Sequence, residues 1–256
     1  MVLAAGLGTR LRPLTDDRPK ALVTVGGRTL LEIVLERLRG FGVCEAIVNA
    51  HHFADQIVEF VAAHDFGMRI EVSREETLLD TGGGIRKAAW FLGSGEAGGV
   101  GGSGIGAGVG AGAGAPFLVH NVDVISGIDL GAMAKFHTES GALATLAVAE
   151  REASRQLLFD EAGVLCGRRK KGDVVEMVRA VIRPRELAFA GIHVLSPRIF
   201  GLMTEEGAFS ILSAYLRLAA EGEKILAFRA DGAYWRDLGR PESVAAAERE
   251  VRVQGA

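Results

Sequence analysis

The stretch that decides the fold opens the chain and reads Leu3-Ala-Ala-Gly6-Leu-Gly8-Thr9-Arg10-Leu-Arg12-Pro-Leu-Thr15-Asp-Asp-Arg18-Pro19-Lys20. An apolar strand over residues 1–5 leads into a turn with two glycines, where backbone N–H groups can approach an anion closely. Four basic residues follow within fourteen residues of Gly6, namely Arg10, Arg12, Arg18 and Lys20. The guanidinium groups of arginines, each with several N–H donors, and the ammonium group of a lysine can together neutralise several phosphate oxygens. The stretch therefore predicts a polyphosphate site at the end of the first strand.

Outward from this stretch, short apolar strands alternate with amphipathic helices. In the first half we expect strands at 1–5, 44–49, 68–72 and 116–121 and helices at 30–38, 54–63 and 85–92. The second half is more mixed, with strands at 143–149, 189–195 and 225–228, a hairpin of 157–159 with 164–166, and helices at 210–220 and 241–251. The alternation predicts an α/β fold, a Rossmann-like, mixed and mostly parallel sheet with helices on both faces.

A dinucleotide-binding enzyme is the first alternative for the glycine turn. The dinucleotide fingerprint needs a third glycine at position 11, where this chain has Leu11, and a helix that starts at once, which Pro13 discourages. Hydride transfer on a Rossmann fold is therefore disfavoured.

As a whole, the opening stretch resembles the signature of the sugar-1-phosphate nucleotidyltransferase family, LAAGxGTRLxPLTxxxPK, and it has every fixed position. Four further strings are similar to parts of the family's site. Leu79-Asp-Thr-Gly-Gly-Gly84-Ile resembles its base-contacting loop, and Ala190-Gly191-Ile-His-Val its sugar-site strand. Val119-His-Asn121-Val-Asp123 resembles the setting of its first metal aspartate, and Tyr234-Trp235-Arg-Asp237-Leu-Gly239 that of its second. By length and by these strings, the chain resembles the subgroup of N-acetylmuramate 1-phosphate uridylyltransferases and short mannose-1-phosphate guanylyltransferase-like enzymes.

The resemblance implies a set of site residues. The implied catalytic residues are Arg10, Lys20, Asp123 and Asp237, and the two aspartates would share a Mg²⁺. The implied substrate-binding residues are Ala5, Gly6, Gly8, Thr9, Gly82, Gly83, Asn121 and Gly191. Both reactants are anionic, so this chemistry needs positive charge and alignment, and Mg²⁺ favours one or two carboxylates plus phosphate oxygens. No Glu-Lys-Pro sugar motif is found, and Ser154-Arg155-Gln156 is the other candidate for sugar contacts.

The resemblance also implies the partners, an NTP and a sugar 1-phosphate, and the organisation of the chain. We expect a single domain over 1–256 as a monomer or small homo-oligomer, with a nucleotide-binding half at 1–125 and a sugar-binding half at 126–256. No hexapeptide repeat follows the last helix, so no β-helix domain is expected. UTP with an amino-sugar 1-phosphate such as N-acetylmuramate 1-phosphate is favoured, and Asp80, Glu75 or Glu76 would close the base pocket.

Three alternatives stay open for the function. They are GTP with mannose or heptose 1-phosphate, cytidylyl transfer to an alcohol phosphate such as phosphocholine, and a non-catalytic sugar-nucleotide sensor. A phosphocholine site needs an aromatic cage, which is hard to build with 2 Trp and 2 Tyr.

Composition limits the other possibilities. The 256 residues are 48% hydrophobic and carry a net charge of −3, which argues against a nucleic-acid partner and an anionic membrane surface. No leader and no spanning segment are visible, so we expect a cytoplasmic protein. Cys44 and Cys166 are expected to be reduced core thiols, His120 and His193 core histidines, and the basic run 168–171 a solvated turn.

One segment stands apart from the fold. Residues 93–115 hold 12 of the chain's 35 glycines and follow a monotonous Gly-Ala pattern. No Lys-Ser/Thr follows, as a phosphate-binding glycine loop would require. We therefore expect a flexible surface insertion between the helix at 85–92 and the strand at 116–121.

Overall fold

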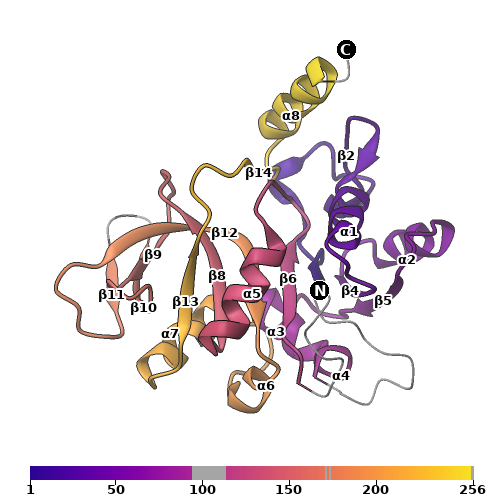
Figure 1. Ribbon diagram of the computed structural model, residues 1–256. Helices are drawn as coiled ribbons and strands as arrows, with labels where there is room; N and C mark the ends of the chain where they lie inside the picture. The colour runs from indigo at the N-terminus through magenta and orange to yellow at the C-terminus, as the bar shows by residue number, and fades with distance from the viewer. Residues whose placement is uncertain (94–113, 171, 173, 255–256) are drawn as a thin grey trace.

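One mixed β-sheet runs through the structure, a computed structural model that describes residues 1–93, 114–170, 172 and 174–254. Among these residues the sheet has 10 strands in the order β11-β10-β9-β12-β6-β1-β4-β5, and β8 and β13 extend it beside β12. The insertion predicted at 93–115 lies, except for its ends, outside the described residues. The predicted fold class is confirmed (Figure 1).

The strands of the nucleotide half are parallel, as the alternation of strands and helices predicted. They are β1 (Val2–Leu3), β4 (Glu45–Ala50), β5 (Arg69–Arg74) and β6 (Phe117–Asn121). Strand β1 lies between β4 and β6, with Val2 opposite both Val48 and His120. The loop that follows β1 therefore leaves the sheet from its centre, where the carboxyl ends of parallel strands form the usual binding edge.

The other half of the sheet is organised around one long strand. It contains β8 (Ala144–Ala149), β9 (Gln156–Phe159), β10 (Leu165–Arg169), β11 (Val175–Met177), β12 (Arg185–Leu195) and β13 (Ile225–Arg229). Strand β12 pairs antiparallel with β6, β8 and β9, and the predicted β9–β10 hairpin is present. Among the described residues of this half, only β13 runs parallel to its neighbour, β8.

Helices cover both faces of the sheet, and strand residues alternate between two cores. Helices α1 (Leu30–Gly40), α2 (Ala54–Ala63) and α5 (Leu130–Ser140) pack on one face, and α3 (Asp80–Lys87), α6 (Ile199–Leu202) and α7 (Ile211–Ala220) on the other. On β4, for example, Val48 faces the first group and Ile47 the second. Figure 1 shows α5 lying across β8 and β6.

Shorter elements complete the chain. They are η1 (Thr9–Leu11), η2 (Lys20–Leu22), β2 (Thr24–Val25), β3 (Arg28–Thr29), α4 (Ala89–Leu92), β7 (Val124–Ser126), β14 (Trp235–Asp237) and α8 (Pro241–Gln254). Helix α8 extends from the body of the molecule near the β2–β3 hairpin (Figure 1). Among the described residues, no helix combines the length and apolar composition that crossing a membrane requires.

Three local predictions need correction. The helix expected at 85–92 begins at Asp80 and is broken into α3 and α4. Cys44 is exposed because β4 starts one residue later, whereas Cys166 is buried, which raises the pKa of its thiol to about 11. Arg168 and Arg169 belong to β10 and not to a turn, because they pair across the sheet with Glu176 and Glu186.

Candidate active site

The glycine turn after β1 folds around two buried side chains, Leu11 and Thr15. Gly8 has a positive φ of 66°, and a Cβ there would lie 2.9 Å from Thr15 Cγ2. The Thr15 hydroxyl donates to the Gly8 carbonyl over 2.9 Å and closes the turn. Among the predicted phosphate-binding residues of the turn, Ala5 is buried and Gly8 half-buried, while Gly6, Thr9 and Arg10 are exposed. The turn thus presents a backbone edge and a guanidinium to solvent at the centre of the sheet.

The two predicted metal aspartates come together because β14 pairs antiparallel with β7, with Asp237 opposite Val124. The Leu238 N–H donates to the Asp123 carbonyl over 2.7 Å, which fixes the following turn. Both carboxylates then reach the same backbone position. A Cβ on Gly239 would lie 2.7 Å from Asp237 Oδ1 and 3.3 Å from Asp123 Oδ2.

Arg10 and Lys20 approach the same place from the opening stretch. The Arg10 guanidinium Nη2 would lie 2.9 Å from a Cβ on Gly239. Lys20 Nζ forms an ion pair with Asp123 Oδ2, and both side chains are largely buried. Three of the four predicted catalytic residues therefore meet at one glycine, and the fourth, Lys20, pairs with one of them. Sequence analysis quoted Gly239 without giving it a role, and the signal was its place two residues after Asp237.

The carboxylate pair fits Mg²⁺. In the part of the chain that the structure describes, no group of three or more His, Cys, Asp and Glu side chains could hold a metal ion. Asp123 and Asp237 alone would supply two ligands, and Mg²⁺ takes its others from phosphate oxygens and water. A binding site of this kind is incomplete until the substrate phosphates arrive.

Asn121 and Gly191 lie side by side at the same edge of the sheet. Gly191 on β12 has a positive φ of 76°, and a Cβ there would lie 2.8 Å from Asn121 Nδ2 and 3.1 Å from Val124 Cγ2. Only glycine fits this backbone without displacing Asn121. These two predicted substrate-binding residues, of which Gly191 belongs to the predicted sugar-site strand, thus pack together, with Asn121 at the end of β6, two residues before Asp123, and Gly191 on the neighbouring β12.

The triple glycine at 82–84 is helical and buried, which corrects the predicted loop. A Cβ on Gly82 would lie 2.9 Å from the Phe209 carbonyl oxygen, and one on Gly83 would collide with the Gly207 carbonyl. A Cβ on Gly84 would lie 2.7 Å from Asn49 Nδ2. Each glycine therefore allows α3 to pack closely against a neighbouring segment. That Gly82 and Gly83 contact a base stays a prediction.

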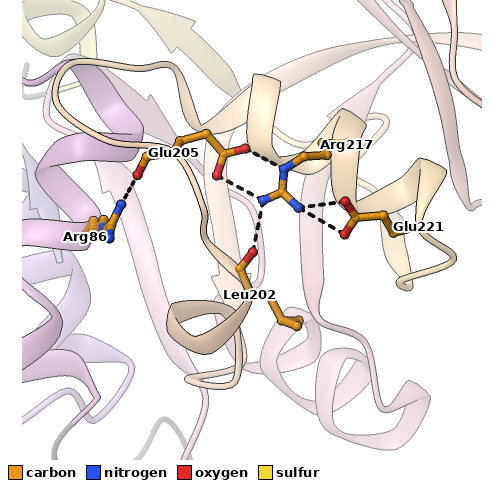
Figure 2. Close-up of polar contacts among 5 residues, drawn as sticks. All are labelled: Arg86, Leu202, Glu205, Arg217 and Glu221. Atoms are coloured by element: carbon orange, nitrogen blue, oxygen red, sulfur yellow. Dashed lines mark hydrogen bonds and ion pairs between the residues drawn. The ribbon is translucent and has the colours of Figure 1, made fainter.

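The segment that packs on these glycines is anchored by Arg217 of α7 (Figure 2). Its guanidinium donates to the Glu205 carboxylate over 2.8 and 3.0 Å and to the Leu202 carbonyl over 3.0 Å, and it also pairs with Glu221. These carboxylates raise the pKa of Arg217. Arg86 of α3 donates to the Glu205 carbonyl from the other side. This network holds residues 202–209 against α3.

A buried polar chain connects the glycine turn with α3. Asn49 Oδ1 accepts from the Ala4 N–H over 2.7 Å, and Asn49 Nδ2 donates to Glu75 Oε1 over 2.7 Å. The other Glu75 oxygen accepts from the Leu79 N–H over 3.0 Å. Glu75 is thus committed to holding the start of α3, so of the three acids predicted to close a base pocket, Asp80 and Glu76 retain exposed side chains.

Comparison with known proteins identifies the family of the chain. The nucleotidyl transferase family matches residues 1–254. The chain is 33% identical to N-acetylmuramate alpha-1-phosphate uridylyltransferase of Caulobacter vibrioides, over 97% of this chain and 94% of that protein. It is 28% identical to mannose-1-phosphate guanylyltransferase of Mycobacterium tuberculosis, over 94% of this chain but only 61% of that longer protein.

Solved structures show the same fold at lower identity. A putative glucose-1-phosphate thymidylyltransferase from Bacillus anthracis superposes with a TM-score of 0.74 at 15% identity, covering 98% of this chain and 94% of the other. The inositol-1-phosphate CTP transferase from T. maritima gives 0.72 at 16% identity with the same coverage. The chain belongs to the nucleotidyl transferase family and is a nucleotidyltransferase, as its opening stretch predicted.

Proposed function

We propose that the protein transfers a uridylyl group from UTP to a sugar 1-phosphate, with N-acetylmuramate 1-phosphate as the favoured acceptor, in a reaction that needs Mg²⁺. The observation that carries the proposal is that Asp123, Asp237 and Arg10 converge on Gly239, with Lys20 paired to Asp123. Two carboxylates beside two cations suit a reaction between two anionic phosphates.

In the reaction, an oxygen of the sugar phosphate attacks the α-phosphorus of the NTP, and the bond from that phosphorus to the bridging oxygen of the β-phosphate breaks. Pyrophosphate leaves with the bond's electron pair, and the NDP-sugar forms. Asp123 and Asp237 would hold a Mg²⁺, which supplies positive charge to the reacting phosphates when bound.

The chain's own groups do the rest. Arg10 holds the β- and γ-phosphates that leave, and the backbone of Gly6, Gly8 and Thr9 lines the triphosphate. Lys20, which pairs with Asp123, stabilises the charge that gathers between the two reacting phosphates. Asn121 and Gly191 hold the sugar, and Gly82 and Gly83 lie on the base side.

The acceptor and the base rest on the similarity to the Caulobacter uridylyltransferase, which covers nearly the whole of both chains. Mannose-1-phosphate guanylyltransferases are the second candidate class, because several of them match 94% of this chain at 26–28% identity. The second candidate would use GTP with mannose 1-phosphate.

A panel assay separates the two. Pyrophosphate release is measured with four NTPs against a dozen sugar 1-phosphates, together with phosphocholine, at saturating Mg²⁺. We expect the highest kcat/KM with UTP and N-acetylmuramate 1-phosphate. A GTP preference of tenfold or more would transfer the proposal to the guanylyltransferase class, and absence of pyrophosphate release with every pair would indicate a sensor.

A further inference from the structure

Arg151 occupies an unusual position beside the candidate sugar site. It lies two residues after the end of β8, and its guanidinium stacks on the indole of Trp235, 3.6 Å from the ring centroid. Arg151 Nη2 donates to the Phe189 carbonyl over 2.7 Å, and Trp235 Nε1 donates to the Ala190 carbonyl over 2.9 Å. The side chain is therefore held between Phe189 of β12 and Trp235 of β14. Phe189 lies two residues before Gly191, and Trp235 lies two residues before Asp237.

The charge of this guanidinium has no counter-ion within the described residues. Its Nε is buried without a hydrogen-bond partner, and no carboxylate pairs with it. Two acids that line the cavity at this guanidinium, Glu150 and Asp231, pair with Arg229 instead, at 3.1 and 2.5 Å. Burial lowers the pKa of Arg151, with Asp237 opposing the shift, yet arginine remains protonated at neutral pH.

A half-buried cation without an ion-pair partner lowers the free energy of unfolding. A negatively charged group on a bound ligand would supply the missing partner and offset this cost. A cavity of about 230 Å³ opens at Arg151, lined also by Trp235, Ala190 and Gly232. Because sites for drug-sized ligands have volumes of about 300–1,000 Å³, this cavity suits one substituent of a larger molecule.

Resting on the proposed function, we propose that Arg151 is a specificity residue that binds a carboxylate-bearing substituent on the acceptor sugar. N-acetylmuramate carries such a group, and the matching neutral sugar, N-acetylglucosamine, does not. The planar guanidinium has donors left for a bidentate contact, and the Trp235 face fixes its plane. The sugar phosphate is a different anion, common to every acceptor, and Arg10 and Lys20 already face the phosphate region.

The test compares acceptors in the intact enzyme with UTP and Mg²⁺. kcat/KM is measured for N-acetylmuramate 1-phosphate, glucuronate 1-phosphate and neutral N-acetylglucosamine 1-phosphate. Arg151→Gln should lower kcat/KM at least 30-fold for the preferred acidic acceptor, mainly through KM, and change the neutral acceptor less than threefold. Arg151→Lys, which keeps the charge, should recover part of the loss, and Arg185→Gln, an exposed arginine at the start of β12, should change neither.

The outcomes separate the two proposals. If the wild type prefers an acidic acceptor and Arg151→Gln keeps that preference, or loses both acceptors equally, the assignment of Arg151 is wrong and the proposed function stands. If the wild type accepts glucuronate 1-phosphate but not N-acetylmuramate 1-phosphate and the variant loses it, only the proposed acceptor is wrong. If the wild type uses no acidic acceptor, both are wrong. Thermal melting of each variant checks that the fold is intact.

Discussion

The two halves of the sheet supply their site residues in opposite ways. In the nucleotide half, one continuous stretch from Gly6 to Lys20 provides the glycine turn and both cations. The proposed sugar contacts come from three places far apart in sequence: Asn121 ends β6, Gly191 lies within β12, and Arg151 lies in the loop after β8. The first arrangement leaves a continuous motif in the sequence, and the second leaves only scattered single residues.

The difference follows from strand direction. Parallel strands end at one edge of the sheet, so the single loop after β1 can hold a polyphosphate there. The long antiparallel β12 passes β6, β8 and β9 and brings Gly191 to that edge from the middle of a strand. The two halves join where β6 pairs with β12, and the separate pairing of β7 with β14 brings Asp237 next to Asp123.

The largest expected effect tests the two aspartates that the pairing of β7 with β14 brings together. Asp123→Asn and Asp237→Asn each remove one charge at constant volume, and each should lower kcat by about 1,000-fold, or about 4 kcal/mol. Because both act on one ion, the double variant should cost little more than the worse single one. Pyrophosphate release at saturating Mg²⁺ measures this, with the exposed Asp55→Asn as control. Near-wild-type turnover in either variant would remove that carboxylate from the metal site.

The next largest effect separates the roles of Arg10 and Lys20, the two cations of the continuous stretch. Arg10→Ala should weaken both NTP use and pyrophosphate use in the reverse reaction, since Arg10 holds the leaving group. Lys20→Ala should lower kcat by about 100-fold with less change in NTP binding, because its charge stabilises the transition state. Steady-state kinetics in both directions, with NTP binding by calorimetry, separates the two. A Lys20 variant that loses binding alone would contradict the assignment.

Sequence analysis predicted the fold and named the four candidate catalytic residues because both predictions rest on local patterns. Apolar periodicity located β4, β6 and β8 within a residue or two, and the opening stretch identified the family. It missed Gly239 and Arg151, whose roles depend on pairing between distant strands. It placed 82–84 in a loop on the resemblance to the family's base-contacting loop, whereas these glycines lie in α3 and allow close packing against 207–209 and Asn49.

A smaller effect concerns stability in the sugar half. His137 of α5 is buried against β8, with Nδ1 2.9 Å from Thr145 Oγ1, and burial lowers its pKa to about 4. Between pH 6.5 and 4 the unfolded chain binds a proton that the folded protein does not, so stability is lost as the pH falls.

Urea unfolding at pH 7.5 and 5.0 checks this. The wild type should lose about 2 kcal/mol more than His137→Asn over this interval, at about 1.4 kcal/mol per pH unit below 6.5. Activity at pH 7.5 should be unchanged in the variant. Equal losses in the two proteins would mean that His137 does not titrate differently in the folded and unfolded states.

The smallest effect compares one glycine from each half. Gly8→Ala and Gly191→Ala both place a Cβ on a left-handed backbone, at φ 66° and 76°, and both press on a neighbour, Thr15 or Asn121. Each strained position costs about 1–3 kcal/mol, so the losses of kcat/KM should be about tenfold. If the two halves bind different substrates, Gly8→Ala should raise KM for the NTP and Gly191→Ala should raise KM for the sugar 1-phosphate. Gly40→Ala, at the end of α1 where a Cβ meets no atom within 4 Å, is the control. Two variants that raise the same KM would show that the division of the sheet into a nucleotide side and a sugar side is wrong.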